Sequence, residues 1–467
     1  MVRAAPQGSV HARPGGRTLT AAPPPGVPGP GPYPSITLGE LLDARAPNGM
    51  RTVAVRRPQV PLVQLRLQIP LGDVRVRDIT TLRLLPKMLL AGTGARSGSE
   101  MAAAIQRIGA SLDTWADPDH LSIAASAPRE HLTDILELVG DVVANPSFPA
   151  GEVVGERERV AQEILQEAAD PVSVATRALM AVLFPGHAYA DPLPGITTVR
   201  RASRATLRTF HDARVLPGAA SLVVVGDVDP SEAVEAVRRT LGTWSAGTSA
   251  PGADALEAPA TPRKERGILV VHRPGAVQSN LRIGARCAGR HDPAFPALAL
   301  AMTAFGGSFT SRLVTNLRER NGYTYSPRAG VDEHRRAAAV TVRAEVATEV
   351  TARALAEVRY ELARMATAPV TPEELESSRR YVTGVAAMSS STQAGLADVL
   401  ASLVGNDLDP PYLEDFIDAL SRVDSEAVSQ VAARSLAPAS MTTVVVGDAD
   451  VVVDALSPLD LVTVVGH

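Results

Sequence analysis

The sequence predicts an α+β protein with two homologous domains in tandem, each a mostly antiparallel sheet packed with helices and related to the other by a pseudo-twofold axis. Three observations support this fold class. The chain has 467 residues, which is too long for one ordinary hydrophobic core. A stretch rich in proline and small residues, 246–266, lies near its midpoint. The parts on either side of that stretch echo one another.

The echo has a nearly constant offset. Residues 55–67, "VRRPQVPLVQLRL", match residues 271–283, "VHRPGAVQSNLRI", at an offset of 271 − 55 = 216, which pairs Arg66 with Arg282. The string "VVVGD" begins at Val223 and returns 444 − 223 = 221 residues later. Short valine-rich strings alone are weak evidence, but matches in the same order across two halves indicate an internal duplication.

The composition of local segments sets the domain boundaries. Residues 1–35 contain "AAPPPGVPGPGPYP", whose proline and glycine disfavour helix and sheet, so we expect a disordered arm. Residues 36–246 then form the N-terminal domain and residues 265–460 the C-terminal domain. The segment 247–264 is the linker between them.

Each half changes its hydrophobic period along the chain. Apolar runs such as "PLVQLRLQI" and "SLVVVGD" predict strands, whereas "HLTDILELVGDVVA" and "TARALAEVRYELARMA" have helical spacing. Residues 230–242 begin with proline and acidic residues, end with arginines and stop at a glycine, which predicts a helix. The acidic residues at its start and the arginines at its end interact favourably with the helix dipole. Helices packed on a sheet are therefore expected in both halves.

Charge and apolar content exclude several classes of protein. The net charge is −4 and the pI is near 6.2, so no basic field attracts nucleic acid or an anionic membrane. No apolar run reaches secretory or transmembrane length, so we expect a cytoplasmic protein. The single cysteine, Cys287, cannot form an internal disulfide, and a small buried residue is favoured over a catalytic thiol.

Several motifs follow one another in a characteristic order. They are "MLLAGT", "GASLDTW", "GHAYADPLPGITTV" and "FGGSFTSRLVTNLRERNGYTYS". This order resembles the pitrilysin or insulinase type of zinc metallopeptidase, a group that includes the mitochondrial processing peptidases. The resemblance covers approximately residues 38–457 and implies two homologous domains per chain.

The resemblance also locates a degenerate metal site. Members of the family carry H-x-x-E-H on the helix before a stretch like "MLFKGT", where two histidines bind zinc and the glutamate activates water. Aligning "MLLAGT" with that stretch places Arg83 and Lys87 at the ligand positions and Pro86 at the position of the base. Guanidinium and ammonium groups have no lone pair for a metal. Proline costs ~3 kcal/mol inside a helix, so we expect the helix to begin near Pro86 or to kink there.

The resemblance implies a third ligand position at Glu163, which lies 163 − 87 = 76 residues after Lys87. One carboxylate alone binds zinc weakly. We therefore favour a surface acid or an ion-pair partner for Arg83 or Lys87. No two of the nine histidines stand three or four residues apart, so no other region offers the motif, and we expect this chain to bind no metal.

The second half carries the other family signature. Residues 308–326, "SFTSRLVTNLRERNGYTYS", predict a helix capped by Ser308, with Phe309, Leu313 and Leu317 on one face and a stop at Asn321-Gly322, followed by a turn into a strand.

In the family, the matching segment bears an arginine and a tyrosine seven residues apart that reach the zinc, and Arg318 and Tyr325 match them in type and spacing. A phenol can donate to the negative charge that hydrolysis builds on a carbonyl oxygen, and an arginine can hold the substrate. The alternative is a solvated helix arginine and a packed strand aromatic.

Two further motifs have a functional and a structural interpretation. "FGGSF" lacks the Gly-Lys-Ser/Thr of a phosphate loop, so a tight helix entry is favoured. The resemblance gives its Gly306 and Gly307 a part in substrate handling as the lesser option. "GASLDTW", residues 109–115, resembles the strand that pairs with substrate in catalytic members, and a plain sheet strand is at least as well supported.

Two homologous domains are half of the four-domain chamber in which the family cleaves peptides. The resemblance therefore implies a heterodimer in which a homologous H-x-x-E-H subunit holds zinc. This chain, which binds no cofactor itself, completes the site with Arg318 and Tyr325 for cleavage of peptides or precursor leader peptides. The alternative is a structural or peptide-binding subunit without proteolysis. An independent hydrolase is poorly supported, because no Ser-His-Asp, Cys-His or paired-carboxylate arrangement stands out.

Overall fold

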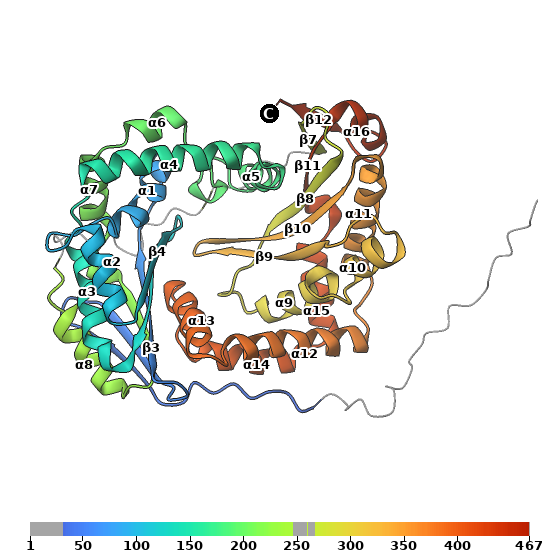
Figure 1. The fold of residues 1–467 in the computed structure, drawn as a ribbon. Coiled ribbons are helices and arrows are strands. Elements are labelled where there is room, and N and C mark those ends of the chain that lie inside the picture. Colours follow the sequence, from blue (N-terminus) through green and yellow to red (C-terminus); the bar gives the residue numbers. More distant parts are fainter. Residues whose placement is uncertain (1–30, 246–258, 260–266, 467) are drawn as a thin grey trace, which may run out of the picture.

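The computed structural model describes residues 31–245, 259 and 267–466, and it contains two six-stranded sheets covered by helices (Figure 1). The prediction of an α+β fold with two tandem domains is confirmed. The predicted arm up to residue 30 and the predicted linker, apart from Pro259, lie outside the described residues.

The two sheets have matching strand orders, β1-β2-β6-β3-β5-β4 and β12-β7-β11-β8-β10-β9. The strands of the first are β1 Leu41–Arg45, β2 Arg51–Arg56, β3 Leu62–Pro70, β4 Ser111–Ala116, β5 His120–Pro128 and β6 Ser221–Gly226. Those of the second are β7 Ile268–His272, β8 Gln278–Cys287, β9 Arg328–His334, β10 Ala337–Ala347, β11 Thr442–Gly447 and β12 Val462–Val465.

Strand β2 runs parallel to β6, and β7 runs parallel to β11 and β12, while the other neighbouring strands are antiparallel. The second sheet therefore extends past residue 460, the predicted end of its domain.

Helices follow the same division. The first half contains α1 Ile79–Leu89, α2 Gly98–Arg107, α3 Leu132–Ala144, α4 Ala150–Ala169, α5 Pro171–Leu183, α6 Ile196–Arg201, α7 Arg204–Arg214 and α8 Pro230–Thr240. The second contains α9 Phe295–Met302, α10 Arg312–Val314, α11 Thr351–Thr367, α12 Pro372–Ser389, α13 Gln393–Gly405, α14 Tyr412–Arg422, α15 Ser425–Ser435 and α16 Ala449–Leu456. Two π-helical segments, Thr303–Gly307 and Thr315–Arg320, continue α9 and α10.

The register of the sheets reproduces the sequence echo. Arg66 on β3 lies opposite Val223 on β6, and Arg282 on β8 lies opposite Val444 on β11. The two pairs of matched residues are thus direct cross-strand neighbours in both sheets. This agreement at the level of single residues is the structural expression of the internal duplication.

Each sheet is covered on one face by a helix from the other half of the chain (Figure 1). Helix α13 of the second half packs on β3 and β6 of the first sheet, and α5 of the first half packs on β8 and β11 of the second. Successive strand residues point to opposite faces, so Val224 enters the core of its own domain while Val223 faces α13. Because both faces are buried, β6 and β11 are continuously apolar.

The paired arginines Arg66 and Arg282 reach from these central strands to the exchanged helices. Arg66 Nε donates to Asp398 of α13 at 2.5 Å. Arg282, which is 1% exposed, donates from Nε to Thr176 Oγ1 of α5 at 3.3 Å and forms an ion pair with Glu345 at 2.9 Å. Burial lowers the pKa of Arg282. A buried guanidinium is stable only when its hydrogen-bonding groups are satisfied, so these contacts fix the exchanged helices on the sheets.

The start of the described chain also crosses to the second domain. Tyr33 Oη donates to Glu376 of α12 at 2.6 Å, and the Leu38 amide donates to Glu414 of α14 at 2.9 Å. Residues 31–35, which the sequence assigns to a disordered arm, therefore lie against helices α12 and α14.

One helical run has the length and hydropathy of a membrane span. Within the described residues, Phe295–Arg320 extends over 26 residues with a mean hydropathy of 1.2 in its most apolar window. The expectation that no stretch reaches this length was therefore wrong. However, 67% of that window is buried inside the protein, and Phe305, Leu313 and Leu317 are fully buried in the core of the second domain. The run is a core element.

We expect Arg282→Ala to destabilise the protein by about 3 kcal/mol, because it removes a buried side chain and leaves α5 without its polar contact to the sheet. Arg343→Ala is the matched control, since this arginine lies on the adjacent strand and its side chain is 44% exposed. Its loss should cost less than about 1 kcal/mol. Urea unfolding curves of both variants measure the difference, and equal shifts would contradict the assigned role of Arg282.

Candidate functional site

Helix α1 carries the degenerate metal-site positions. It begins at Ile79 and continues through Pro86, so of the two alternatives the start near Pro86 was wrong, and a kink there stays a prediction. Proline at this position leaves the Leu82 carbonyl without its helical donor. Nine of the eleven helix residues are buried, and this tertiary burial offsets the loss of one backbone hydrogen bond. The Pro86 carbonyl itself accepts from Thr114 Oγ1 of β4 at 2.8 Å.

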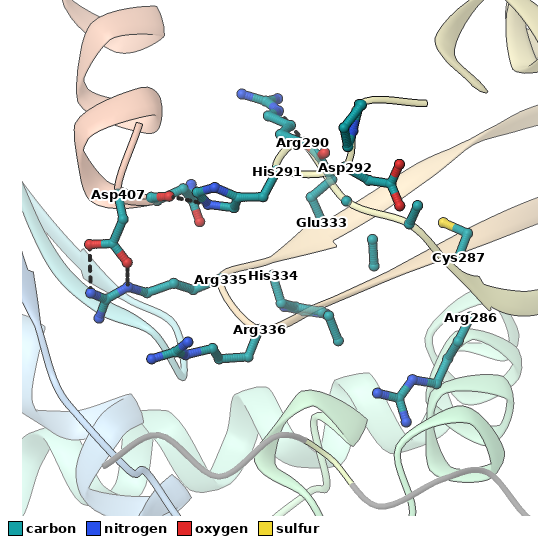
Figure 2. A pocket seen from close by; sticks show the side chains of 16 residues that line it. Arg286, Cys287, Arg290, His291, Asp292, Glu333, His334, Arg335, Arg336 and Asp407 are labelled. Carbon is teal, nitrogen blue, oxygen red and sulfur yellow. Dashed lines mark hydrogen bonds and ion pairs between the residues drawn. The ribbon is translucent and has the colours of Figure 1, made fainter. Parts of the chain in front are cut away.

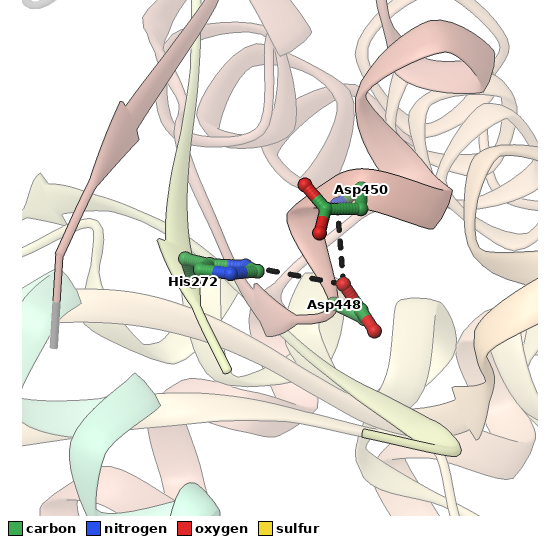
Figure 3. Close-up of side chains that lie close together, drawn as sticks. All are labelled: His272, Asp448 and Asp450. Carbon is green, nitrogen blue, oxygen red and sulfur yellow. Dashed lines mark hydrogen bonds and ion pairs between the residues drawn. The ribbon is translucent and has the colours of Figure 1, made fainter. Parts of the chain in front are cut away.

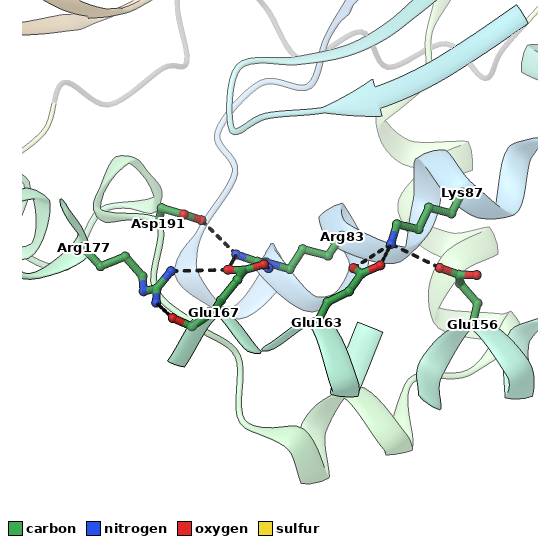
Figure 4. A network of polar contacts seen from close by, with 7 residues as sticks. All are labelled: Arg83, Lys87, Glu156, Glu163, Glu167, Arg177 and Asp191. Atoms are coloured by element: carbon green, nitrogen blue, oxygen red, sulfur yellow. Dashed lines mark hydrogen bonds and ion pairs between the residues drawn. The ribbon is translucent and has the colours of Figure 1, made fainter. Parts of the chain in front are cut away.

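Lys87 pairs with carboxylates of α4 (Figure 4). Its Nζ donates to both carboxylate oxygens of Glu163 at 2.6 and 2.7 Å, and it lies 3.4 Å from Glu156 Oε1. The prediction that Glu163 is an ion-pair partner is confirmed. Glu156 is 5% exposed, and its Oε1 accepts no hydrogen bond from the described residues. The Arg159 guanidinium forms an ion pair with Glu156 Oε2, and the ammonium group of Lys87 is a second compensating charge for this buried carboxylate.

Arg83 extends the same network (Figure 4). Its guanidinium donates to both oxygens of Glu167 at 2.7 and 3.1 Å and to Asp191 at 3.3 Å. Arg177 of α5 also donates to Glu167, at 3.3 Å. Burial disfavours the charge on Arg83, but Glu167 and Asp191 outweigh it and raise the pKa of this side chain. The ion pairs of Arg83 with Glu167 and of Lys87 with Glu163 therefore join α1 to α4.

These side chains do not fit a zinc ion. Arg83 and Lys87 offer no lone pair, and their positive charges point at the same carboxylates that a dication would need. Glu163 and Glu167 already accept hydrogen bonds from the two cations. The network can hold α1 against α4, and it lacks the set of ligands that a zinc ion requires.

The helix of the second signature starts later than the sequence predicts. Ser311, not Ser308, is the residue before α10, and no side-chain hydrogen bond caps that helix. Phe309 consequently lies outside the helix and is 67% exposed, while Leu313 and Leu317 are fully buried. The prediction that all three share one buried face was wrong for Phe309. The stop at Asn321-Gly322 is confirmed, with Gly322 at φ 63°.

Arg318 and Tyr325 lie side by side. The Arg318 guanidinium carbon is 4.6 Å from the centre of the Tyr325 ring and 4.3 Å from that of Phe309. Tyr325 is 78% exposed and lies in the loop before β9, so the alternative of a packed strand aromatic was wrong. Its phenol has no hydrogen-bond partner among the described residues. The pair thus offers a free donor beside a fixed cation.

A buried amide network fixes the helix that carries Arg318. Asn316 Nδ2 donates to Glu361 at 2.7 Å and to Glu357 at 2.8 Å, and Asn321 Nδ2 donates to Asn316 Oδ1 at 2.7 Å. Glu361 is fully buried and also pairs with Arg364 of the same helix, α11. Sequence reasoning missed this support, because a single asparagine inside a helix gives no signal of its partner.

Gly306 and Gly307 differ in their surroundings. A Cβ on Gly306 would lie 2.7 Å from the Ala329 Cβ of β9, so glycine is required for the close approach of the π-helical segment to that strand. Gly306 is buried, whereas Gly307 is exposed. Packing accounts for Gly306, and a part in substrate handling stays a prediction for Gly307.

Strand β4, which contains most of "GASLDTW", forms the edge of the first sheet. Its outer side has no neighbouring strand among the described residues, and Trp115 is 44% exposed. The arrangement confirms a sheet strand and leaves its backbone groups open on one side.

Within the described chain, no hydrogen bond, ion pair or ring contact joins Arg318 or Tyr325 to Arg83 or Lys87.

A groove of about 780 Å³ lies where the β9–β10 hairpin meets the C-terminal end of α13 (Figure 2). At its side, Asp119 of the first domain accepts from Tyr189 Oη at 2.6 Å and from the Arg335 amide at 2.9 Å. Arg335 also donates twice to Asp407 at 2.8 Å. Of these contacts, the hydrogen bond from the Arg335 amide to Asp119 joins the hairpin of the second domain to the first. Nothing in the sequence indicates this contact, because its two residues lie far apart along the chain.

Three potential metal ligands also gather at the start of α16 (Figure 3). The ligand atoms of His272, Asp448 and Asp450 lie within 4.8 Å of one another. His272 Nδ1 accepts from the Ala449 amide at 3.0 Å, and Asp448 Oδ1 accepts from the Asp450 amide at 3.1 Å. Capping of the helix accounts for these two atoms.

The family of the chain follows from its match to two models. Residues 55–195 match insulinase (peptidase family M16), and residues 201–382 match the peptidase M16 inactive domain. This chain belongs to the insulinase (M16) peptidase family. Together the two matches cover the degenerate metal helix and the segment with Arg318 and Tyr325.

Relatives within the M16 family are distant. An uncharacterized zinc protease of Mycobacterium leprae is 29% identical over 297 residues, which are 61% of this chain and 64% of that protein. The chain therefore matches less than two thirds of the length of that relative. Subunit 1 of the human mitochondrial cytochrome b-c1 complex is 26% identical over 159 residues, which are 34% of this chain and 33% of that protein.

Solved structures share the fold. A peptidase M16 inactive domain from Pseudomonas fluorescens superposes with a TM-score of 0.81 at 22% identity and covers 88% of this chain and 98% of its own. The periplasmic protease PqqL of Escherichia coli gives a TM-score of 0.75 at 16% identity, and the match covers 89% of this chain but 46% of PqqL. At these identities the likeness concerns the fold alone.

The frame of the metal site can be tested by restoring its ligands. We expect Arg83→His, Pro86→Glu and Lys87→His together to bind about one zinc per chain, because Glu163 already faces the position of Lys87 from α4. Elemental analysis after dialysis measures the metal. Adding Glu163→Gln should remove it. A folded triple variant without zinc would show that α1 and α4 are not placed for metal coordination.

Cys287 should react slowly with thiol reagents in the native protein. Burial raises the pKa of its thiol to about 12, so that at pH 8 the thiolate fraction is far smaller than in the unfolded chain. We expect alkylation by iodoacetamide at pH 8 to be at least about 100-fold slower in the native chain than in guanidinium chloride. Cys287 itself is half-buried and lines the groove beside the β9–β10 hairpin, so the prediction of a buried residue holds only in part. Similar rates in both conditions would contradict the raised pKa of this thiol.

Proposed function

We propose that this chain is the non-catalytic half of a heterodimeric zinc endopeptidase. A homologous subunit carrying H-x-x-E-H holds the zinc ion and its water, and this chain completes the site with Arg318 and Tyr325. The substrates are peptides or the leader peptides of precursors. On its own the chain has no peptidase activity.

The observation that carries the proposal is the contrast between the two domains. In the first domain, Arg83 and Lys87 form ion pairs where a metal would need ligands. In the second, the phenol of Tyr325 is 78% exposed, has no hydrogen-bond partner within the described chain and lies beside the Arg318 guanidinium. A chain without metal ligands that still carries an exposed phenol donor and a guanidinium group is suited to complete a reaction centre whose metal is held by another chain.

Chain length supports the need for a partner. The match to PqqL covers 46% of that protease, so a longer chain accommodates this fold in about half its length. Two separate chains of the present size would supply the same amount of structure. The buried arginines and the exchanged helices make each such half a rigid unit that can associate as a whole.

The chemistry assigned to the pair follows from the charge that develops during hydrolysis. Attack of water on a peptide carbonyl places negative charge on the oxygen, and a phenol donor aimed at that oxygen stabilises the transition state more than the ground state. A planar guanidinium can donate hydrogen bonds from its fork of N–H groups to the backbone carbonyl of a bound peptide. The hydrogen bond of Asn316 to Glu361 anchors the helical segment that carries Arg318, and this fixes the backbone from which the guanidinium extends.

A phenylalanine at position 325 should abolish most of the activity of the complex. Tyr325→Phe removes only the donor, so we expect the cleavage rate to fall about 10²–10³-fold with co-purification of the subunits unchanged. The assay uses the chain co-expressed with an H-x-x-E-H homologue and a fluorogenic peptide. Tyr360→Phe is the matched control, because Tyr360 is 55% exposed on α11 and is assigned no function. An undiminished rate in Tyr325→Phe would refute the role of the phenol.

A second candidate is a structural or peptide-binding subunit. It is favoured by the similarity to subunit 1 of the mitochondrial cytochrome b-c1 complex, over 159 residues. Under this alternative the Lys87–Glu163 network serves only to stabilise the fold, and the exposed pair has no substrate. Arg318→Ala and Tyr325→Phe would then leave every measurable property of the assembled complex unchanged.

A further inference from the structure

Phe309 is an exposed aromatic residue that the proposed function does not use. It follows the π-helical segment Thr303–Gly307 and precedes α10, and it is 67% exposed. Its ring has one recorded partner among the described residues, the guanidinium of Arg318 at 4.3 Å. A single exposed apolar side chain is common on protein surfaces. A ring placed over the cation of a candidate site requires a separate explanation.

We propose that Phe309 is a positioning residue that holds the Tyr325 phenol through the Arg318 guanidinium. The inference rests on the proposed function and names a third member of its site. Phe309 and Tyr325 both contact the guanidinium, at 4.3 and 4.6 Å. The described residues include no direct contact between the two rings. The cation is therefore the bridge from one ring to the other.

The physical basis is the attraction of a cation to the negative face of an aromatic ring. At exposed sites one such contact changes a local equilibrium by about 2- to 5-fold. The guanidinium is planar and stacks well on rings, so two contacts restrict its rotation more than one does. Arg318 also pairs with Glu319 at 3.2 Å, but the Glu319 side chain is 58% exposed and a single surface ion pair fixes geometry poorly.

Tyr325 depends on this contact because little else holds it. It lies in a loop between Gly322 and β9, its ring is exposed, and its phenol makes no hydrogen bond to the described residues. The backbone of Arg318, by contrast, is fixed, since its carbonyl accepts from the Gly322 amide at 3.2 Å and its helix is anchored at Asn316. The order of support therefore runs from the helix to the cation, and from the cation to the phenol.

The first test is spectroscopic and needs no partner. The full chain is labelled with 3-fluorotyrosine, and the ¹⁹F resonance of Tyr325 is assigned from its loss in Tyr325→Phe. We expect Phe309→Ala to move this resonance more than half of the way to its position in the unfolded chain, and Phe309→Trp to restore it. Met388→Ala is the control, because Met388 is 77% exposed on α12 and has no recorded contact with Arg318. An unchanged resonance in Phe309→Ala would overturn the proposal.

The second test measures function in the heterodimer. Phe309→Ala should lower kcat about 2- to 5-fold at unchanged KM, because the phenol occupies its productive place less often. In a Tyr325→Phe background the same change should have no further effect. Losses that multiply independently would overturn positioning. If Tyr325→Phe itself leaves cleavage intact, the proposed function fails, and the fluorine resonance alone then decides whether Phe309 holds Tyr325.

Discussion

The exchange of helices between the two halves is the constraint on which the rest of the structure depends. Each central sheet has one face that its own half does not cover, and that face is closed by α13 or α5 from the other half. Arg66 and Arg282 add a buried polar contact at equivalent places in the two sheets. Separating the halves would expose two valine-rich faces and two buried guanidinium groups, so the domains behave as one body. The contact between Arg335 and Asp119 and the segment at Tyr33 reinforce a relation that the exchange already fixes.

The duplication and the kinds of secondary structure were predictable because they depend on local pattern. Period-two and period-3.6 runs identify strands and helices, and the offset between Arg66 and Arg282 survives as the register of the sheets. The exchange was not predictable from the apolar character of α5 and α13 alone, since a helix face does not state which sheet it covers. A signal existed in "VVVG", because a strand with no polar alternation is buried on both faces and needs a second covering layer.

Some features of the candidate site were likewise predictable from the sequence, and others were not. The pairing of Glu163 with Lys87 could be predicted because the family resemblance places both residues at one metal site and their charges are opposite. The place of Phe309 could not, because an ideal helical period starting at Ser308 puts it beside Leu313, whereas the chain interrupts the helix between Gly307 and Ser311. The passage of α1 through Pro86 shows a third limit. Local propensity predicted a break, and burial of the surrounding helix outweighed it.

The packing of α13 on the first sheet also determines when the N-terminal domain can complete its folding during synthesis. A ribosome releases the first sheet long before residues 393–405, yet the face formed by Val53, Val55, Val223 and Val225 packs against that helix. One apolar face of the first sheet therefore stays exposed to solvent until synthesis is nearly complete and α13 can pack on it. Truncated products that end before α13 would leave this apolar face uncovered, and we expect them to aggregate.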